Sequence, residues 1–358
     1  MLLLAFCIAL ILSLLVTPLV IRFSLMVGAA DKPNSRKVHA KVMPSAGGLA
    51  IFISFVAVYL IMTPYVPFVE YNKIAILAGA FVIVLFGLMD DIHEMKARTK
   101  LVGQIAAALI VVYWGGIQVE FINLPFGGKL DFGVMSVPIT IIWIVGITNT
   151  INLIDGLDGL AAGVSSFALL SISGMALIMN DTFVAIIALI VTGSTLGFLK
   201  FNFFPAKVFM GDTGALFLGY IISVLSLLGF KNVTFISLVV PIIILGVPIS
   251  DTFFAIIRRI VNKQPIAAPD KSHLHHCLLR IGFTHKQTVL LIYAIAASFG
   301  LAAFIFTMST VWGAMLFIAV IIIAIELFVE SIGLVGHDYR PLLKFLNLKS
   351  ANNVKDRP

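Results

Sequence analysis

Apolar residues run in long stretches along the 358-residue chain, and short polar segments separate them. A helix needs roughly 20 apolar residues to cross a bilayer, whereas the strands of a membrane β-barrel are shorter and alternate in polarity. The long stretches therefore predict an all-α polytopic integral membrane protein with about eleven transmembrane helices. The expected spans are 2–23, 46–63, 73–89, 101–115, 137–152, 159–178, 183–200, 214–229, 234–257, 288–307 and 310–332.

The ninth expected span, 234–257, contains Pro241 and Pro248. Each proline removes a helical hydrogen bond, so we expect this helix to be broken or kinked near Pro248. Irregular backbone at membrane depth occurs where it is buried in protein, and Asp251 would lie in such surroundings. A packing kink without a functional role is the alternative.

One expected outer loop is longer than the others. Within residues 116–136, Ile117, Val119 and Phe121 alternate with polar side chains, and Gly127-Gly128 is a turn signal, which predicts a small outer hairpin. We find no internal repeat, so one transmembrane domain is expected over residues 1–336, followed by a basic cytoplasmic tail at 337–358.

Lys and Arg collect in alternate loops. If the N-terminus is outside, 21 of the 24 basic residues fall on the inner side, all except Lys73, Lys129 and Lys231. Cytoplasmic loops are enriched in these residues, so the pattern predicts an outside N-terminus and a cytoplasmic C-terminus. The net charge of +7 then reflects topology and attraction to anionic lipid, and requires no nucleic acid. With 60% hydrophobic and 11% charged residues, a soluble enzyme is excluded.

Four polar clusters lie in the inner loops, and the first contains Asp90, Asp91 and Glu94. On a helix, Asp90 and Glu94 share a face while Asp91 points about 100° away, so the two aspartates can do different jobs. Adjacent carboxylates near a membrane repel one another, and Mg²⁺, a substrate cation or Lys96 and Arg98 could relieve this. A solvated loop with local charge pairs is the alternative.

The second cluster is Asn152, Asp155 and Asp158, in an inner loop without any Lys or Arg. Helical winding would align residues spaced by three, and the neighbouring Gly156 and Gly159 would let the backbone approach a ligand. Hard oxygen ligands of this kind suit Mg²⁺, which usually keeps water and substrate phosphate in its shell. An ordinary Gly/Asp turn is the alternative.

The third cluster runs from Asn202 through Phe209 to Gly-Asp212-Thr-Gly, directly before an expected span. A glycine-rich turn at a helix start can present backbone N–H groups and a carboxylate to a phosphate–metal unit. Phe209 could stack on a base. Interfacial packing of Phe209 and simple N-capping by Asp212 are the alternatives.

The fourth cluster is Lys271-Ser-His273-Leu-His275-His276, in a long basic loop. The spacing lacks the partner residues of a zinc site, which favours phosphate binding or proton handling over a metal; a solvated basic loop is the alternative. Together the four clusters predict a phosphate–Mg²⁺ site at the inner membrane surface, acting on a cytoplasmic diphosphate and a lipid.

At these residues the chain resembles the polyprenyl-phosphate N-acetylhexosamine-1-phosphate transferase superfamily, which includes the MraY, WecA and TagO enzymes. The resemblance covers nearly the whole chain, and it looks closest to the TagO branch of Gram-positive bacteria. The matching stretches are DKPNSRKVHAKVMPSAGG, GLMDDIHE, TNTINLIDGLDGLAAG, NFFPAKVFMGDTGALFLGY, LGVPISDT and APDKSHLHH. One departure is Glu94, where some members have Lys.

The resemblance implies transfer of GlcNAc-1-phosphate from UDP-GlcNAc to undecaprenyl phosphate, with release of UMP and with Mg²⁺ or Mn²⁺ as cofactor. The enzyme would lie in the bacterial plasma membrane with its site facing the cytoplasm, and would begin wall teichoic acid or a related glycan. The resemblance leaves open whether the enzyme forms a homodimer. The implied residues are Asn152 and Asp212 for the metal; Asp90, Asp91, Asp155, Asp158 and His276 for catalysis; and Arg36, His39, Lys41, Asn202, Phe209, His273 and His275 for substrate binding.

Two other functions fit parts of the sequence. The Asp90-Asp91-x-x-Glu94 motif resembles the aspartate-rich motif of an intramembrane prenyltransferase, although no second such motif follows. The many spans and the interrupted ninth one also fit a transporter, but transporter sites lie near the bilayer midplane. The residues also leave open whether the lipid phosphate attacks directly or an aspartate is phosphorylated first.

Overall fold

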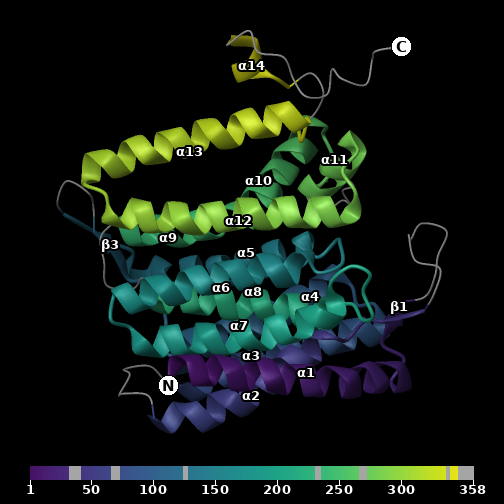
Figure 1. Ribbon diagram of the computed structural model, residues 1–358. Helices are drawn as coiled ribbons and strands as arrows, with labels where there is room; N and C mark the ends of the chain where they lie inside the picture. The colour runs from purple at the N-terminus through teal and green to yellow at the C-terminus, as the bar shows by residue number, and fades with distance from the viewer. Residues whose placement is uncertain are drawn as a thin grey trace, which may run out of the picture.

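The computed structural model describes residues 1–31, 42–65, 73–123, 128–229, 235–265, 272–335 and 339–345. Over these ranges the chain forms a helical bundle with two short β-hairpins (Figure 1). The α-helices are α1 (Leu2–Met26), α2 (Gly48–Met62), α3 (Lys73–His93), α4 (Ala97–Leu109), α5 (Ser136–Ile154), α6 (Leu160–Ile178), α7 (Thr182–Asn202), α8 (Gly211–Gly229), α9 (Phe235–Ile244), α10 (Gly246–Val261), α11 (Leu274–Ile281), α12 (His285–Met308), α13 (Val311–Ile332) and α14 (Pro341–Phe345). Short helical turns are η1 (Thr63–Tyr65), the π-helical η2 (Ile110–Trp114) and η3 (Gly133–Met135).

Eight helices within the described ranges are long and apolar enough to cross a membrane: α1, α3, α5 with η3, α6, α7, α8, α12 and α13. The predicted all-α polytopic class is thereby confirmed. The other three expected spans are also helical but are built from shorter pieces, namely α2, α4 continued by η2, and α9 followed by α10. The total of eleven crossings stays a prediction.

Helices α7 and α8 form the centre of the bundle. Helix α7 packs against α1 and α6, and α8 packs against α3 and α5. Gly193 and Gly197 of α7 lie directly against the carbonyl oxygens of Phe6 and Leu10 in α1, so that a Cβ at either glycine would clash. Small residues that let helix backbones approach this closely favour helix association in lipid.

The ninth expected span is interrupted near Pro248, as predicted. Helix α9 ends at Ile244, and α10 begins at Gly246, with Leu245 between them. Pro248 lies in the first turn of α10, where its missing N–H has no helical partner to lose. The expectation that Asp251 lies in irregular backbone is therefore wrong, because this residue is inside α10.

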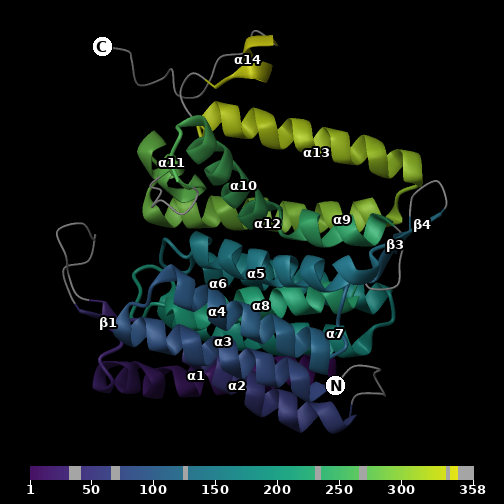
Figure 2. The same cartoon turned by 180° about the vertical axis from the view of Figure 1, so that it is seen from behind.

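The two hairpins lie at opposite ends of the bundle (Figures 1 and 2). Strands β3 (Phe121–Asn123) and β4 (Lys129–Asp131) pair in antiparallel fashion, which confirms the predicted hairpin, and they lie at the end where the chain begins. Strands β1 (Ala30–Asp31) and β2 (Met43–Pro44) pair at the other end, where α11 also lies. One end of several long helices lies at the same end of the bundle as β1.

Candidate active site

A cavity of about 480 Å³ opens at the β1 end of the bundle. It collects three of the four clusters singled out in the sequence, which are more than 100 residues apart from first to last. The described residues that line it include no Lys or Arg, but they include seven carboxylates: Asp31, Asp90, Asp91, Glu94, Asp155, Asp158 and Asp212. Such an excess of negative charge is stable when a cation shares the site.

The two adjacent aspartates at the end of α3 have different partners, as the helical spacing predicts. The Asp91 carboxylate accepts hydrogen bonds from the backbone N–H groups of Asp212 and Thr213, at 2.9 and 3.1 Å, and from the Thr213 hydroxyl at 2.5 Å. Asp91 therefore caps the N-terminus of α8 from another helix. Asp90 accepts a hydrogen bond from the Met95 N–H at 2.6 Å and forms an ion pair of 2.8 Å with Lys100.

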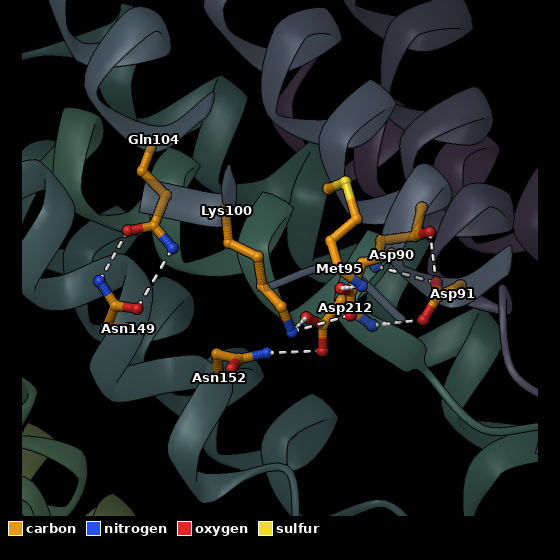
Figure 3. Close-up of polar contacts among 9 residues, drawn as sticks. Asp90, Asp91, Met95, Lys100, Gln104, Asn149, Asn152 and Asp212 are labelled. Carbon is orange, nitrogen blue, oxygen red and sulfur yellow. Dashed lines mark hydrogen bonds and ion pairs between the residues drawn. The ribbon is translucent and has the colours of Figure 1, made fainter. Parts of the chain in front are cut away.

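Asp212 is the meeting point of α4, α5 and α8 (Figure 3). One of its carboxylate oxygens lies 2.5 Å from Lys100 Nζ, and the other accepts a hydrogen bond of 3.0 Å from Asn152 Nδ2. Asp212 lies in the first turn of α8 and does not cap that helix, because Asp91 does. The proposed metal ligands Asn152 and Asp212 are thus adjacent.

Lys100 was not among the residues singled out from the sequence. Lys96 and Arg98 were offered there as partners for the acidic cluster, but both are exposed, and the charge that reaches the carboxylates is that of Lys100. The sequence did contain an indication that Lys100 lies at the edge of the bundle, because it directly precedes the apolar stretch that begins at residue 101. Its side chain is therefore held at the buried edge of the bundle.

Asp155 and Asp158 follow α5 and lie in the same cavity. Burial, followed by the negative charges of Asp212, Asp91 and Asp158, raises the pKa of the Asp155 carboxyl to about 8. Asp158 is buried, and one of its oxygens accepts a hydrogen bond of 3.0 Å from the Ala206 N–H. Asp158 therefore also fixes the loop between α7 and α8.

Asn202 and Phe209 bound that loop and both line the cavity. Asn202 donates a hydrogen bond of 2.9 Å to the Val208 carbonyl, while its buried Oδ1 has no hydrogen-bond partner among the described residues. The Phe209 backbone is held on both sides, because its N–H donates to Pro44 O and its carbonyl accepts from Gly47 N. These two bonds fix the Phe209 backbone beside the cavity.

None of the three histidines of the fourth cluster is among the residues that line the cavity. His273 Nδ1 lies 2.9 Å from a carboxylate oxygen of Asp251, whose other oxygen accepts from the Leu274 N–H at 2.7 Å. His276 is exposed, and its ring lies 4.2 Å from that of His275. Asp251, named in the sequence only for the expected helix break, therefore holds the start of the His-rich helix.

His275 is buried against Gly156, where a Cβ would clash with its ring. Neither of its ring nitrogens has a hydrogen-bond partner among the described residues. Burial, and next the proximity of His276, lowers the pKa of His275 to about 3. His275 therefore offers an uncharged surface behind the cavity wall at neutral pH.

Three of the expected substrate-binding residues, Arg36, His39 and Lys41, lie outside the described residues. Asp31 precedes that segment and Ser45 follows it, and both residues line the cavity.

Comparison with known proteins places the chain among enzymes of lipid-linked sugar transfer. It is 49% identical over 343 residues, 95% of each chain, to a Bacillus subtilis protein named probable undecaprenyl-phosphate N-acetylglucosaminyl 1-phosphate transferase. It is also 34% identical to the decaprenyl-phosphate N-acetylglucosaminephosphotransferase of Mycolicibacterium smegmatis, over 86% of this chain and 83% of that one. Residues 73–230 match the family described as glycosyl transferase family 4. The chain belongs to glycosyl transferase family 4.

A more distant relative is the undecaprenyl-phosphate alpha-N-acetylglucosaminyl 1-phosphate transferase of Escherichia coli K12, 28% identical over 77% of each chain. The resemblance read from the sequence motifs is confirmed by these matches. The family 4 match spans α3 to α8, and so it contains the Asp90, Asn152 and Asp212 sites. The His-rich helix α11 lies beyond the matched range.

The residues of the cavity fit a divalent cation that is shared with a substrate. Among the described residues there is no group of three His, Cys, Asp or Glu side chains arranged to hold a metal by itself. Mg²⁺ usually binds through one or two carboxylates together with water and substrate phosphates. Asp212, with the neighbouring Asn152 amide, offers such a partial set in an acidic cavity.

Proposed function

We propose that this family 4 enzyme transfers GlcNAc-1-phosphate from UDP-GlcNAc to undecaprenyl phosphate and releases UMP. The names of the relatives support the lipid acceptor and the amino sugar. The observation that carries the proposal is the acidic cavity in which Asn152 and Asp212 lie within hydrogen-bond distance. The product would begin wall teichoic acid or a related envelope glycan.

In this proposal Asn152 and Asp212 hold Mg²⁺, or Mn²⁺, against the diphosphate of the nucleotide sugar. A divalent cation there neutralises charge on the phosphoryl oxygens. Phe209 stacks on uracil, and Asp155 and Asn202 lie beside the nucleotide. The unpartnered Asn202 Oδ1 is available to accept a hydrogen bond from it.

The lipid phosphate attacks directly in the proposed reaction. Its oxygen forms a bond to the β-phosphorus, the bond from that phosphorus to the bridging oxygen breaks, and UMP leaves with the electron pair. A phosphate monoester is largely dianionic at pH 7, so little help from a base is needed. Asp90 or Asp91 orients the attacking phosphate and accepts any residual proton.

An isotope experiment separates direct attack from a route through a phosphorylated aspartate. Direct attack predicts no exchange of labelled UMP into UDP-GlcNAc when undecaprenyl phosphate is rigorously absent. Clear exchange without the lipid, or a trapped aspartyl-phosphosugar, would overturn it.

The function itself is tested by UMP release from UDP-GlcNAc in membranes that contain the chain and added undecaprenyl phosphate. We expect release that requires both substrates and a divalent cation. Pyrophosphate release from an isoprenoid diphosphate would indicate a prenyltransferase, and movement of UDP-GlcNAc across vesicles without UMP would indicate a transporter.

We also propose that the cavity faces the cytoplasm. The distribution of Lys and Arg supports this orientation. In a Cys7→Ser background, Lys129→Cys on the hairpin should react with a membrane-impermeant maleimide in intact cells. Lys286→Cys, at the opposite end, should react only after the cells are opened. The reverse result would contradict the orientation.

A further inference from the structure

A pair of amide side chains joins α4 to α5 one helical turn from Lys100 and Asn152, the two residues that contact Asp212. Asn149 Nδ2 donates a hydrogen bond of 2.7 Å to Gln104 Oε1, and Gln104 Nε2 donates one of 3.2 Å to Asn149 Oδ1. Asn149 Nδ2 also donates to the Val145 carbonyl at 2.8 Å. Gln104 is only 2% exposed, so water does not compete effectively for this contact.

The amide pair lies next to the polar contacts of the cavity (Figure 3). Lys100 lies four residues before Gln104 on α4, and Asn152 lies three residues after Asn149 on α5. Residues at these spacings share a helix face, and the order of the pairs shows that the two helices run antiparallel. The pairs Gln104–Asn149 and Lys100–Asn152 are thus consecutive layers of one interface.

The second layer converges on one carboxylate. Lys100 reaches one oxygen of Asp212 and Asn152 reaches the other, so the spacing of α4 and α5 decides whether both contacts form. On its other side α4 is fixed by Gly103, where a Cβ would clash with the Phe86 ring of α3. The amide pair supplies the corresponding constraint toward α5, in both distance and rotation, because two hydrogen bonds form side by side.

We propose that Gln104 and Asn149 are positioning residues, which hold the proposed metal ligand Asn152 in place on Asp212. They act through that side chain and touch no reacting atom. The inference rests on the proposed function for its effect on turnover, but the effect on cation binding is independent of substrate.

The test uses the full chain in lipid nanodiscs. The variants are Gln104→Leu, Asn149→Leu, the double Leu variant, and the exchange Gln104→Asn with Asn149→Gln, which keeps an amide pair of the same total length. The matched control is Ser226→Ala, which removes a 3.0 Å hydrogen bond from Trp143 and so also breaks a contact between α5 and another helix. The measurements are UMP release, Mn²⁺ affinity by electron paramagnetic resonance, and the thermal unfolding midpoint.

Removing residues that orient a metal ligand typically costs about 10- to 100-fold in activity or metal affinity, and we expect losses of that size in kcat and in Mn²⁺ affinity for the Leu variants. KM for UDP-GlcNAc should rise as well, because the cation anchors its diphosphate, and the exchange variant should recover all three properties. The double Leu variant leaves no amide unpaired, so it reports on positioning even where a single variant is too unstable to purify.

The proposal is overturned if the Leu variants match Ser226→Ala in kcat and Mn²⁺ affinity, or if the exchange variant is as impaired as they are. A parent chain that releases no UMP would overturn the proposed function alone. Mn²⁺ affinity, which needs no substrate, would still decide whether the amide pair positions the site.

Discussion

The carboxylate of Asp91 closes the N-terminus of α8 by accepting hydrogen bonds from both the backbone and the hydroxyl of Thr213. A residue of α3 thus performs the capping that a helix ordinarily obtains from its own preceding residue. Gly87, one turn earlier on α3, permits this approach, because a Cβ there would clash with Thr213. The contact fixes the first turn of α8, which carries Asp212.

This arrangement predicts that Asp91→Ala destabilises the protein more than Asp90→Ala does. Loss of an N-cap typically costs about 0.5–2 kcal/mol, and Asp90 has no such role. The thermal unfolding of purified variants in the same detergent gives the comparison. Equal midpoints for the two variants would contradict the capping assignment.

Lys100→Met should lower kcat and raise the affinity for Mn²⁺. The ammonium lies between Asp90 and Asp212, so its removal leaves two carboxylates without their cation. A divalent ion then gains the full attraction of both. Electron paramagnetic resonance titration measures the affinity, and the exposed Lys96→Met is the charge-matched control. Weaker Mn²⁺ binding in Lys100→Met would show that the lysine supports the metal site instead.

Asn152→Ala and Asp212→Ala should each abolish UMP release while the protein still folds. Their proposed role is to hold the cation on the diphosphate, and the MgUDP-GlcNAc complex would lose its anchor without them. Asp131→Ala, which changes an exposed carboxylate on the hairpin of β3 and β4, serves as the control. Full turnover of either site variant at ordinary Mg²⁺ would remove these residues from the metal site.

Phe209→Ala should raise KM for UDP-GlcNAc, since stacking of a base on an aromatic ring contributes on the order of 1–3 kcal/mol. The control is Phe204→Ala in the same loop, because this ring is 43% exposed and stacks on His285 outside the cavity. If Phe209 only packs at the membrane interface, the KM of Phe209→Ala for UDP-GlcNAc will stay constant, and only its thermal unfolding midpoint will fall.

Asp251→Ala should reduce turnover through the His-rich helix. Asp251 accepts from His273 and from the Leu274 N–H, and these contacts set the start of α11 and the place of His276. Residues that act as a unit are not additive, so the double variant Asp251→Ala with His276→Ala should be little worse than either single one. Additive losses in kcat would show that Asp251 acts independently of His276.

Much of the fold could be predicted from the sequence because a membrane imposes a strong pattern. Apolar stretches predicted the long helices within a few residues, and the alternation near Gly127-Gly128 predicted the hairpin. The ninth span shows the limit of such local reasoning. The prolines predicted an interruption near Pro248, which is present, but the helix resumes at Gly246, so Asp251 lies inside α10 and not in irregular backbone.

The sequence by itself determined which chemistry the site can carry, since carboxylates, an amide and an aromatic ring near one predicted surface indicate a phosphate and a cation. Only the tertiary structure decided which contacts each of these groups makes. Asp90 and Asp91 are neighbours in the chain, yet one faces Lys100 and the other caps α8. The contacts of Gln104 and Lys100 in α4 depend on Asn149 of α5 and Asp212 of α8, which follow much later in the chain. Spacing along a single helix predicts which side chains share a face, but contacts between helices depend on how closely their backbones pack, and glycines such as Gly87 set that distance.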